Sequence, residues 1–195
     1  MTPHTIYFVR HGETVWNTER RLQGSIDSPL TERGRAQALA NAQTLIEAVP
    51  EITVLPFVVS PLGRARATLR IIRERIGLPD YGYQIDERLA EVRFGDWEGL
   101  TFKEIETRFS EQWAVRQTAK WAHMPPNGES FAQASERLKD WARDLRSDVV
   151  VVAHGAVGRI LRGLNLGMPE EQIAFSGDPL HDRVYRLSRG TEVEL

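Results

Sequence analysis

Two histidines occur in the same kind of sequence context, and both could take part in phosphate chemistry. His11 follows the apolar run 5–9 and Arg10, whereas His154 follows the apolar run 149–153, and a glycine comes directly after each histidine. A neutral imidazole can attack phosphorus, and a neighbouring guanidinium can hold phosphate oxygens in a planar fork. A lone histidine at a strand end could equally satisfy a backbone carbonyl, so the interpretation depends on the other segments.

A third segment adds a second arginine to this pattern. The apolar run 53–59 ends at Ser60-Pro61, and Arg64 falls in the first turn of the helix predicted to follow. A helix N-terminus favours phosphate through its free N–H groups and its dipole. Open α/β sheets bind ligands at the carboxyl ends of their strands. If these strands are neighbours in a parallel sheet, two histidines and two arginines meet at one place.

The elements that must position these residues alternate along the chain. The predicted strands are 5–9, 53–59, 148–153 and 184–187, and the predicted helices are 31–48, 61–76, 101–122, 131–145 and 155–164. Thr31 is the expected N-cap of the first helix, Pro61 is placed in the first turn of the second, and Pro56 indicates a bend or an edge in its strand. Residues 15–30 are predicted to be a polar loop.

This alternation predicts an α/β fold, a three-layer α/β/α sandwich with a mostly parallel central sheet. We expect residues 1–195 to form a single domain, with a small helical cap at about 92–128 lying over the sheet edge. The breaker Pro125-Pro126-Asn127-Gly128 ends that cap segment, and Ser130 with Gln133 forms a capping-box pair at the start of the next helix.

Composition narrows the class of protein. The 195 residues are 41% hydrophobic and 27% charged, which is ordinary for a globular protein, and the net charge of −2 leaves no electrostatic footprint for nucleic acid. The chain has no cysteine, so disulfides, thiolate catalysis and cysteine-bound zinc are excluded. It shows neither a secretory signal nor a run of roughly 18 apolar residues for a membrane span. We expect a cytoplasmic protein that binds neither nucleic acid nor membrane.

The ordered motifs resemble those of the histidine phosphatase superfamily, in its phosphoglycerate-mutase-like branch. The matching segments span about residues 5 to 165 in the expected order. They are Arg10-His11-Gly12-Glu13-Thr14 with Asn17, Leu30-Thr31-Glu32-Arg33-Gly34 with Gln37, Ser60-Pro61-Leu62-Gly63-Arg64-Ala65 with Thr68, Leu89-Ala90-Glu91 with Phe94-Gly95-Asp96-Trp97-Glu98-Gly99, and Ala153-His154-Gly155. A lone Arg-His-Gly would be weak evidence, whereas five ordered segments are highly specific.

The resemblance implies a role for each matching residue. His11 is the expected nucleophile that becomes a phosphohistidine, and Glu91 is the expected proton donor to the leaving alcohol. A clamp around the phosphoryl oxygens is expected from Arg10, Arg64 and a protonated His154. These groups can compensate phosphoryl charge without a metal or another cofactor.

Further residues are assigned to the substrate side of the site. Asn17 is an expected phosphate contact, and Gln23 with Gly24 resembles a substrate-side position. Glu91 lies among other acids and alone would be interpreted as a surface charge; its spacing from Phe94-Gly95 selects it. Other residues are given ordinary roles: solvent exposure for Arg20 and Arg21, packing for Trp113 and Trp121, and a surface position for His181. Paired histidines also bind zinc or iron, but the flanking arginines would repel a cation.

The resemblance leaves a choice between activities. Mutases of this superfamily usually have a longer middle insertion and C-terminal tail that shield the phosphoenzyme from water. Only about 35 residues separate the Glu91 region from Gly128, so we predict a histidine acid-type phosphatase acting on small phosphorylated metabolites. Phosphoglycerate mutase-type transfer and a non-catalytic domain that binds a phosphate ligand are the alternatives. The sequence also leaves a homodimer open.

Overall fold

The centre of the molecule is a six-stranded sheet in the order β3-β2-β4-β1-β5-β6, seen in a computed structural model that describes residues 2–195. Its strands are β1 (Ile6–Arg10), β2 (Phe57–Val59), β3 (Gln84–Ile85), β4 (Val149–Ala153), β5 (Val184–Ser188) and β6 (Thr191–Glu194). The pairs β1–β4, β4–β2 and β2–β3 are parallel, whereas β5 and β6 are antiparallel to their neighbours at one edge. The mostly parallel sheet is confirmed.

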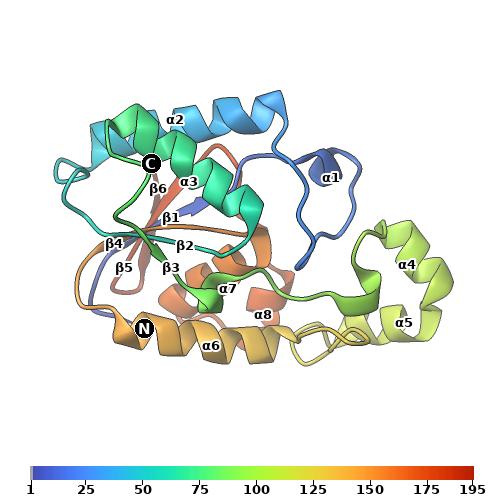
Figure 1. Cartoon of the computed structure of the whole chain (residues 1–195). Helices are drawn as coiled ribbons and strands as arrows, with labels where there is room; N and C mark the ends of the chain where they lie inside the picture. The colour runs from blue at the N-terminus through green and yellow to red at the C-terminus, as the bar shows by residue number, and fades with distance from the viewer. Residues whose placement is uncertain (1) are drawn as a thin grey trace.

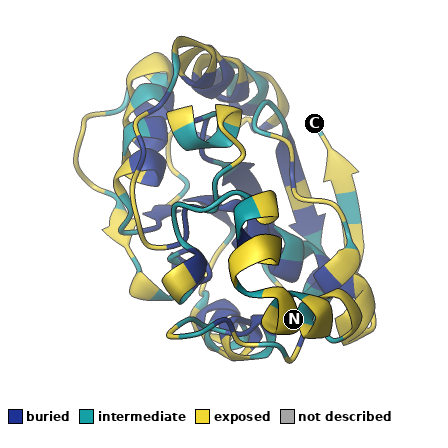
Figure 2. Ribbon diagram, turned by 90° about the vertical axis from the view of Figure 1, so that its right-hand side faces the viewer, coloured by how far each residue is buried: buried dark blue, intermediate teal, exposed yellow. Residues whose placement is uncertain are grey.

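Helices cover both faces of this sheet, as predicted (Figure 1). One face is covered by α2 (Glu32–Ala48) and α3 (Gly63–Ile76), and the other by α6 (Phe131–Asp144), α7 (Gly155–Leu166) and the short α8 (Glu170–Phe175). Alternate residues of β4 point to opposite faces and so join two separate hydrophobic cores. Every residue of β4 is buried, and the inner strands of the sheet form the dark centre of Figure 2, whereas the edge strands β3 and β6 are largely exposed. The three-layer architecture is therefore confirmed.

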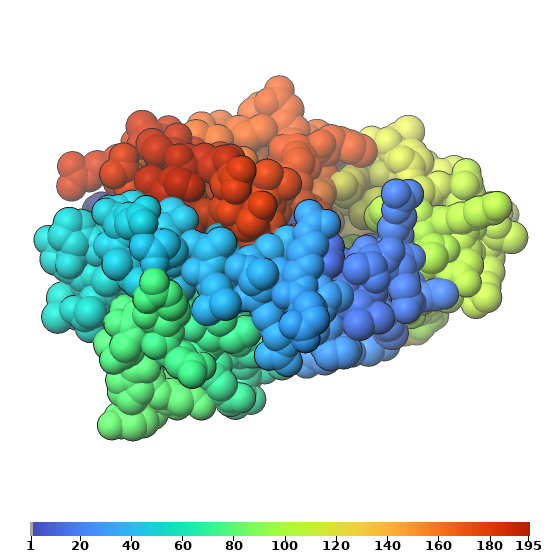
Figure 3. All heavy atoms as spheres, turned by 90° about the horizontal axis from the view of Figure 1, so that it is seen from above, coloured from blue at the N-terminus to red at the C-terminus, as the bar shows by residue number. Residues whose placement is uncertain are grey.

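The segment predicted as a cap lies at one end of the molecule. It contains the short 3₁₀ helix Gly95–Trp97, then α4 (Phe102–Arg108) and α5 (Ser110–Thr118). The helices α4 and α5 lie at the right-hand end of the molecule in Figure 1. Another 3₁₀ helix, Glu87–Leu89, precedes it. Figure 3 shows the same segment beside the chain that follows β1, where α1 (Val15–Thr18) lies. The fully buried Trp97 packs against the rings of Phe109 and Trp113 beneath the two cap helices.

Several predicted boundaries are wrong. Residues 15–30 are not all loop, because Thr14 caps α1 in a capping box. The predicted strand 53–59 is a strand only at Phe57–Val59, and β2 lies inside the sheet rather than at its edge, since it begins just after Pro56. The helix expected from 61 begins at Gly63, so Pro61 precedes it. Helix α8 and strand β6 were not predicted.

Other signals are confirmed. Thr31 accepts a hydrogen bond from the Gly34 N–H as the N-cap of α2, and the capping box of Ser130 starts α6. The helix predicted at 101–122, with an interruption near Ser110, is the pair α4 and α5, which are separated at Phe109 and end at Thr118. Within residues 2–195, no helix is both long enough and apolar enough to span a membrane.

A close backbone contact fixes the loop that follows β1. Gly12 and Gly34 touch each other: a Cβ on Gly12 would lie 2.2 Å from the Gly34 carbonyl oxygen, and one on Gly34 would lie 2.1 Å from the Glu13 carbonyl oxygen. Thr31 strengthens the contact, because its backbone N–H donates to the Glu13 carbonyl at 2.9 Å. Only glycine allows α2 to approach the loop this closely.

This contact predicts an unusual response to alanine. In a helix interior alanine is normally preferred over glycine by about 1 kcal/mol. Gly34→Ala should instead lower the free energy of unfolding by about 1–3 kcal/mol, because the new methyl group overpacks the contact with Glu13. Urea unfolding measures the change. The control is the exposed Ala36→Gly in the same helix, which should lose about 1 kcal/mol from propensity alone. A Gly34→Ala protein as stable as the wild type would contradict this account.

Candidate active site

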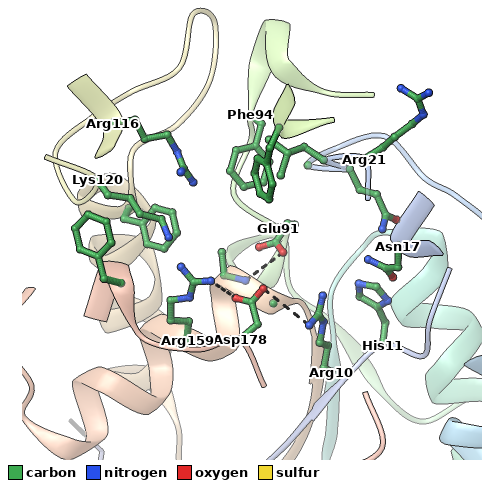
Figure 4. A pocket seen from close by; sticks show the side chains of 18 of the residues that line it. Arg10, His11, Asn17, Arg21, Glu91, Phe94, Arg116, Lys120, Arg159 and Asp178 are labelled. Carbon is green, nitrogen blue, oxygen red and sulfur yellow. Dashed lines mark hydrogen bonds and ion pairs between the residues drawn. The ribbon is translucent and has the colours of Figure 1, made fainter. Parts of the chain in front are cut away.

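A cavity of about 320 Å³ opens at the carboxyl ends of β1 and β4, next to the cap. Its size is at the lower end of the range for small-molecule sites. Every residue predicted for the site lines this cavity except His154, which lies behind it. The lining residues among them are Arg10, His11, Asn17, Gln23, Gly24, Arg64 and Glu91 (Figure 4).

The pairing of β1 with β4 brings the two histidines together. The parallel register places Arg10 opposite Ala153, and the His11 N–H continues the ladder by donating to the Ala153 carbonyl at 2.9 Å. As a result the rings of His11 and His154 lie 5.2 Å apart, centroid to centroid. The expectation that the two strand ends meet in one crevice is therefore confirmed.

The hydrogen bonds of His11 decide which ring nitrogen is free to react. Nδ1 lies 2.8 Å from the Gly12 carbonyl oxygen, which can only accept a hydrogen bond. Nδ1 therefore carries the proton in the neutral ring, and the lone pair is on Nε2. The Gly12 N–H in turn donates to the Thr68 hydroxyl at 3.0 Å, and this bond ties the loop to α3. His11 thus presents an oriented nucleophilic nitrogen.

His154 is fully buried and is held by Ser60. Its Nε2 lies 2.6 Å from the Ser60 hydroxyl, which already accepts a hydrogen bond from the Leu62 N–H. The hydroxyl can donate its own proton to Nε2 while it accepts from Leu62, and we adopt this tautomer, in which Nδ1 carries the ring proton. That Nδ1 has no partner among residues 2–195. A buried donor without a partner is costly, so the site favours an acceptor there.

Both imidazoles are neutral in the free protein. Burial lowers the pKa of His11 well below its usual value, and the nearby Arg64 and Arg10 lower it further. Burial and Arg64 likewise hold the pKa of His154 well below the usual range. The protonated His154 expected in the phosphate clamp is therefore not favoured while the site is free, because burial and the charges of Arg64 and Arg10 disfavour the imidazolium.

The two arginines are fixed by different partners. The side chain of Arg64 is buried, with Nη2 donating to the Gly24 carbonyl at 2.7 Å and Nη1 to Asp27 at 3.0 Å. Arg10 donates from Nη1 to the Pro179 carbonyl at 3.0 Å. The Nε of each arginine is buried without a partner among the described residues. Each guanidinium is thus oriented beside the nucleophile, and its Nε–H remains available to donate a hydrogen bond to a ligand.

Glu91 lies across the cavity from His11, as Figure 4 shows. One carboxylate oxygen accepts from the Val92 N–H at 2.9 Å and the other from the Ala156 N–H at 3.2 Å. Burial nevertheless dominates and raises the pKa of Glu91 above its usual value, against the smaller effects of these bonds and of Arg64. A carboxyl group of this kind can hold a proton at mildly acidic pH and release it to a leaving group.

The substrate-side residues flank the nucleophile. Asn17 uses its carbonyl oxygen to accept from Thr14 in the cap of α1, which turns the side chain towards His11 in Figure 4. Gln23 is buried, and its Oε1 has no partner among residues 2–195. Gly24 has a left-handed backbone with φ of 53°, and its carbonyl holds Arg64.

Sequence reasoning missed part of the cavity wall. Arg21 was assigned to solvent, yet it lines the cavity. Arg116, Lys120, Arg159 and Asp178 line it as well. Arg159 lies four residues after Gly155 on α7, and that helical spacing could have found it. Asp178 and the cap cations lie in segments without a motif.

His181, which was assigned a surface position from the sequence, contacts the nucleophile's loop. Its Nδ1 lies 2.5 Å from the His11 carbonyl oxygen, and its ring centroid is 5.5 Å from that of His11. Burial and Arg10 lower its pKa to about 4, so the neutral ring donates this hydrogen bond. His181 therefore supports the loop that carries the nucleophile, although it does not line the cavity. Among residues 2–195, no cluster of three or more His, Cys, Asp or Glu side chains could hold a metal ion.

Several known proteins are similar to this chain in sequence and in fold. The family model of the histidine phosphatase superfamily (branch 1) matches residues 6–190. A glucosyl-3-phosphoglycerate phosphatase of Mycolicibacterium vanbaalenii is 35% identical over 182 residues, covering 87% of this chain and 77% of that protein. A 2,3-bisphosphoglycerate-dependent phosphoglycerate mutase of Gloeobacter violaceus is 35% identical over 181 residues, covering 85% and 78%. The structure of the α-ribazole phosphatase from Shigella flexneri superposes with a TM-score of 0.82 at 25% identity, covering 98% and 94%.

The imidazole environments predict a specific titration. At pH 6, His11 and His154 should both be neutral in the free protein, since burial and the arginines lower their pKa values. Saturation with inorganic phosphate should shift both titrations to higher pH, because a dianion stabilises the imidazolium. Nitrogen-15 chemical shifts of the rings measure the protonation states. An imidazolium at either position at pH 6 without phosphate would contradict the derived electrostatics.

Proposed function

The chain belongs to the histidine phosphatase superfamily (branch 1), and from this premise we propose that it hydrolyses phosphate monoesters of small molecules through a phosphohistidine on His11. The observation that carries the proposal is an oriented His11 that lines one cavity together with Arg10 and Arg64, with the ring of His154 5.2 Å from its own. An oriented nitrogen nucleophile beside fixed cations is what phosphoryl transfer requires.

In the first step the Nε2 lone pair of His11 forms a bond to phosphorus while the phosphorus–ester oxygen bond breaks. The electron pair goes to the departing oxygen, and the proton of the Glu91 carboxyl group follows it. Donation of this proton avoids release of a free alkoxide. The raised pKa of Glu91 supports this role, because the group stays protonated at a higher pH than an exposed carboxyl group.

The clamp compensates charge during the transfer. We assign the phosphoryl oxygens to the free donors of Arg10 and Arg64, to the Nδ1–H of His154 and to the amide of Asn17. The unpartnered buried nitrogens of Arg10, Arg64 and His154 support this assignment, since an anion would give each an acceptor. A bound dianion would also raise the pKa of His154 and let it take up a proton.

In the second step water cleaves the phosphohistidine. The Glu91 carboxylate takes a proton from water, the water oxygen bonds to phosphorus, and the nitrogen–phosphorus bond breaks. The electron pair returns to Nε2 of His11, and inorganic phosphate leaves. Glu91 is protonated again, and the enzyme is restored for the next turnover.

A mutase activity is the second candidate, favoured by the relative from Gloeobacter violaceus whose name describes one. In that case the phosphoryl group would pass from His11 to a second hydroxyl instead of water. The short cap of α4 and α5 favours hydrolysis, since few residues are available to keep water from His11. The products distinguish the two: a mutase yields a phosphate isomer, whereas a phosphatase yields inorganic phosphate.

The first test is hydrolysis of p-nitrophenyl phosphate with and without EDTA. Wild-type activity should survive EDTA, and His11→Ala should lower it at least about 10³-fold, as expected for loss of a nucleophile. His4→Ala is the matched control, because His4 lies before β1 and does not line the cavity. Loss of activity in EDTA with recovery on adding a metal would overturn the proposed mechanism. Phosphate binding without turnover would instead favour a non-catalytic role.

We also propose that the enzyme is of the acid type, working best below neutral pH. The nucleophile requires neutral His11, whose pKa is lowered below 6.5, and proton donation requires neutral Glu91, whose pKa is raised above 4.5. Activity should therefore rise from acid pH as His11 loses its proton and fall again as Glu91 ionises.

A pH profile of Glu91→Gln tests this assignment. In the wild type, kcat/KM corrected for substrate ionisation should follow a bell whose alkaline limb belongs to Glu91. Glu91→Gln should lose that limb and, with an alkyl phosphate, about 10²-fold or more of the activity, because the leaving alkoxide gains no proton. The acid limb should remain. A variant that keeps the alkaline limb would remove Glu91 from the role.

A further inference from the structure

The wall of the cavity opposite His11 carries a second group of cations that the proposed chemistry does not use. Arg116 comes from α5, Lys120 from the turn after it, and Arg159 from α7. In Figure 4 their charged ends face the interior of the cavity from the side opposite His11 and Asn17. Among the residues that line the cavity, six are arginine or lysine and two are acidic.

Aromatic rings hold the two cap cations in place. The Lys120 ammonium lies 5.4 Å from the ring centroids of both Phe131 and Phe175. The Arg116 guanidinium lies 5.7 Å from the Trp113 ring centroid. Cation–π contacts of this kind restrict where the charge lies but leave its hydrogen-bond donors free. Within residues 2–195, neither side chain forms an ion pair or a hydrogen bond.

Arg159 is more strongly fixed. It donates to the Ala174 carbonyl at 2.7 Å and to Asp178 at 2.5 Å. Asp178 also lies 3.9 Å from Arg10, so this carboxylate links the phosphate side of the cavity to the opposite wall. Because Asp178 is engaged by Arg159 and Arg10, it offsets only part of the charge of Arg116 and Lys120.

The electrostatic balance of this wall is therefore positive. Burial, together with the charges of Arg159 and Arg116, lowers the pKa of Lys120 to about 7. Burial and Arg159 lower the pKa of Arg116 to about 10. When both groups are charged they repel each other, with only Asp178 as a partial counter-charge. An anion placed between them would relieve that repulsion and favour the charged form of Lys120.

We propose that Arg116, Lys120 and Arg159 form a second anion subsite, which binds a carboxylate or a further phosphate on the leaving group of the substrate. This inference rests on the proposed function and narrows it to monoesters of small anionic alcohols. With about 320 Å³, the cavity holds a phosphoryl group near His11 and a short anionic leaving group against the opposite wall. A neutral alcohol would leave the cations of this wall uncompensated.

Matched substrate pairs test the subsite. 3-Phosphoglycerate and glycerol 3-phosphate differ in a carboxylate that is replaced by a hydroxymethyl group, and fructose 1,6-bisphosphate and fructose 6-phosphate differ in a second phosphate. We expect kcat/KM to be at least about tenfold higher for the anionic member of one pair or both, as charge-assisted hydrogen bonds would give. A preference in the first pair identifies a carboxylate site, and one in the second a phosphate site. No preference in either pair overturns the proposal.

A variant that removes one charge then tests whether the preference for the anionic substrate comes from this wall of the cavity. Lys120→Met keeps the apolar stem between the two rings, and Arg116→Met is a second variant in case the first does not fold. Either should lower the ratio of kcat/KM within the preferred pair by about tenfold. Lys103→Met is the control, because Lys103 is an exposed lysine of the cap outside the cavity and should leave the ratio unchanged. An unchanged ratio in folded Lys120→Met and Arg116→Met would overturn the proposal.

Two measurements separate this inference from the proposed function. p-Nitrophenyl phosphate carries no charged group besides its phosphate. Its His11-dependent hydrolysis therefore tests the proposed function without the second anion subsite. Calorimetric binding of the same pairs to His11→Ala tests the subsite without turnover, and the anionic member should again bind about tenfold more tightly. Equal binding would overturn the subsite even if hydrolysis were observed.

Discussion

The parallel pairing of β1 with β4 is the interaction on which the site depends. It continues beyond the strands, since the His11 N–H still bonds to Ala153, and it thereby sets the two imidazoles 5.2 Å apart. Both strands are buried on both faces, so a change of register would disturb two hydrophobic cores at once. The position of the nucleophile is therefore set by a strand pair that lies between the two hydrophobic cores, whereas the loop that follows is fixed by the contact of Gly12 with Gly34.

Electrostatics explains why so many cations can gather around that pairing. Each arginine near His11 is anchored by a backbone carbonyl, of Gly24 for Arg64 and of Pro179 for Arg10, and a carboxylate, of Asp27 or Asp178, balances part of its charge. Burial, reinforced by the positive field of these arginines, lowers the pKa of both imidazoles and keeps them neutral in the free protein. A phosphate dianion reverses this balance, because it supplies the acceptors and the negative charge that the cavity lacks. The same reasoning applies to the opposite wall, where Asp178 balances only part of the positive charge.

The sequence predicted the parts of this arrangement that follow from local rules. Buried strands ending in His11 and His154, the N-cap at Thr31 and the capping box at Ser130 each have a short-range physical signal, and all are confirmed. Strand β6 and helix α8 were missed because they lack an apolar run or a helical repeat and form by packing against α7 and β5. Lys120, Asp178 and His181 reach the site only through tertiary structure, so no spacing within the sequence identifies them.

The central claim is that a covalent phosphohistidine forms on His11 during turnover, and trapping it is the most direct measurement. Enzyme mixed with a phosphate monoester would be quenched within milliseconds, digested under alkaline conditions and analysed by mass spectrometry. The account predicts a phosphoryl group on the peptide that contains His11, lost on mild acid treatment and absent from His11→Ala. Turnover at a normal rate with no phosphoryl group on that peptide, or with one on His154 instead, would contradict it.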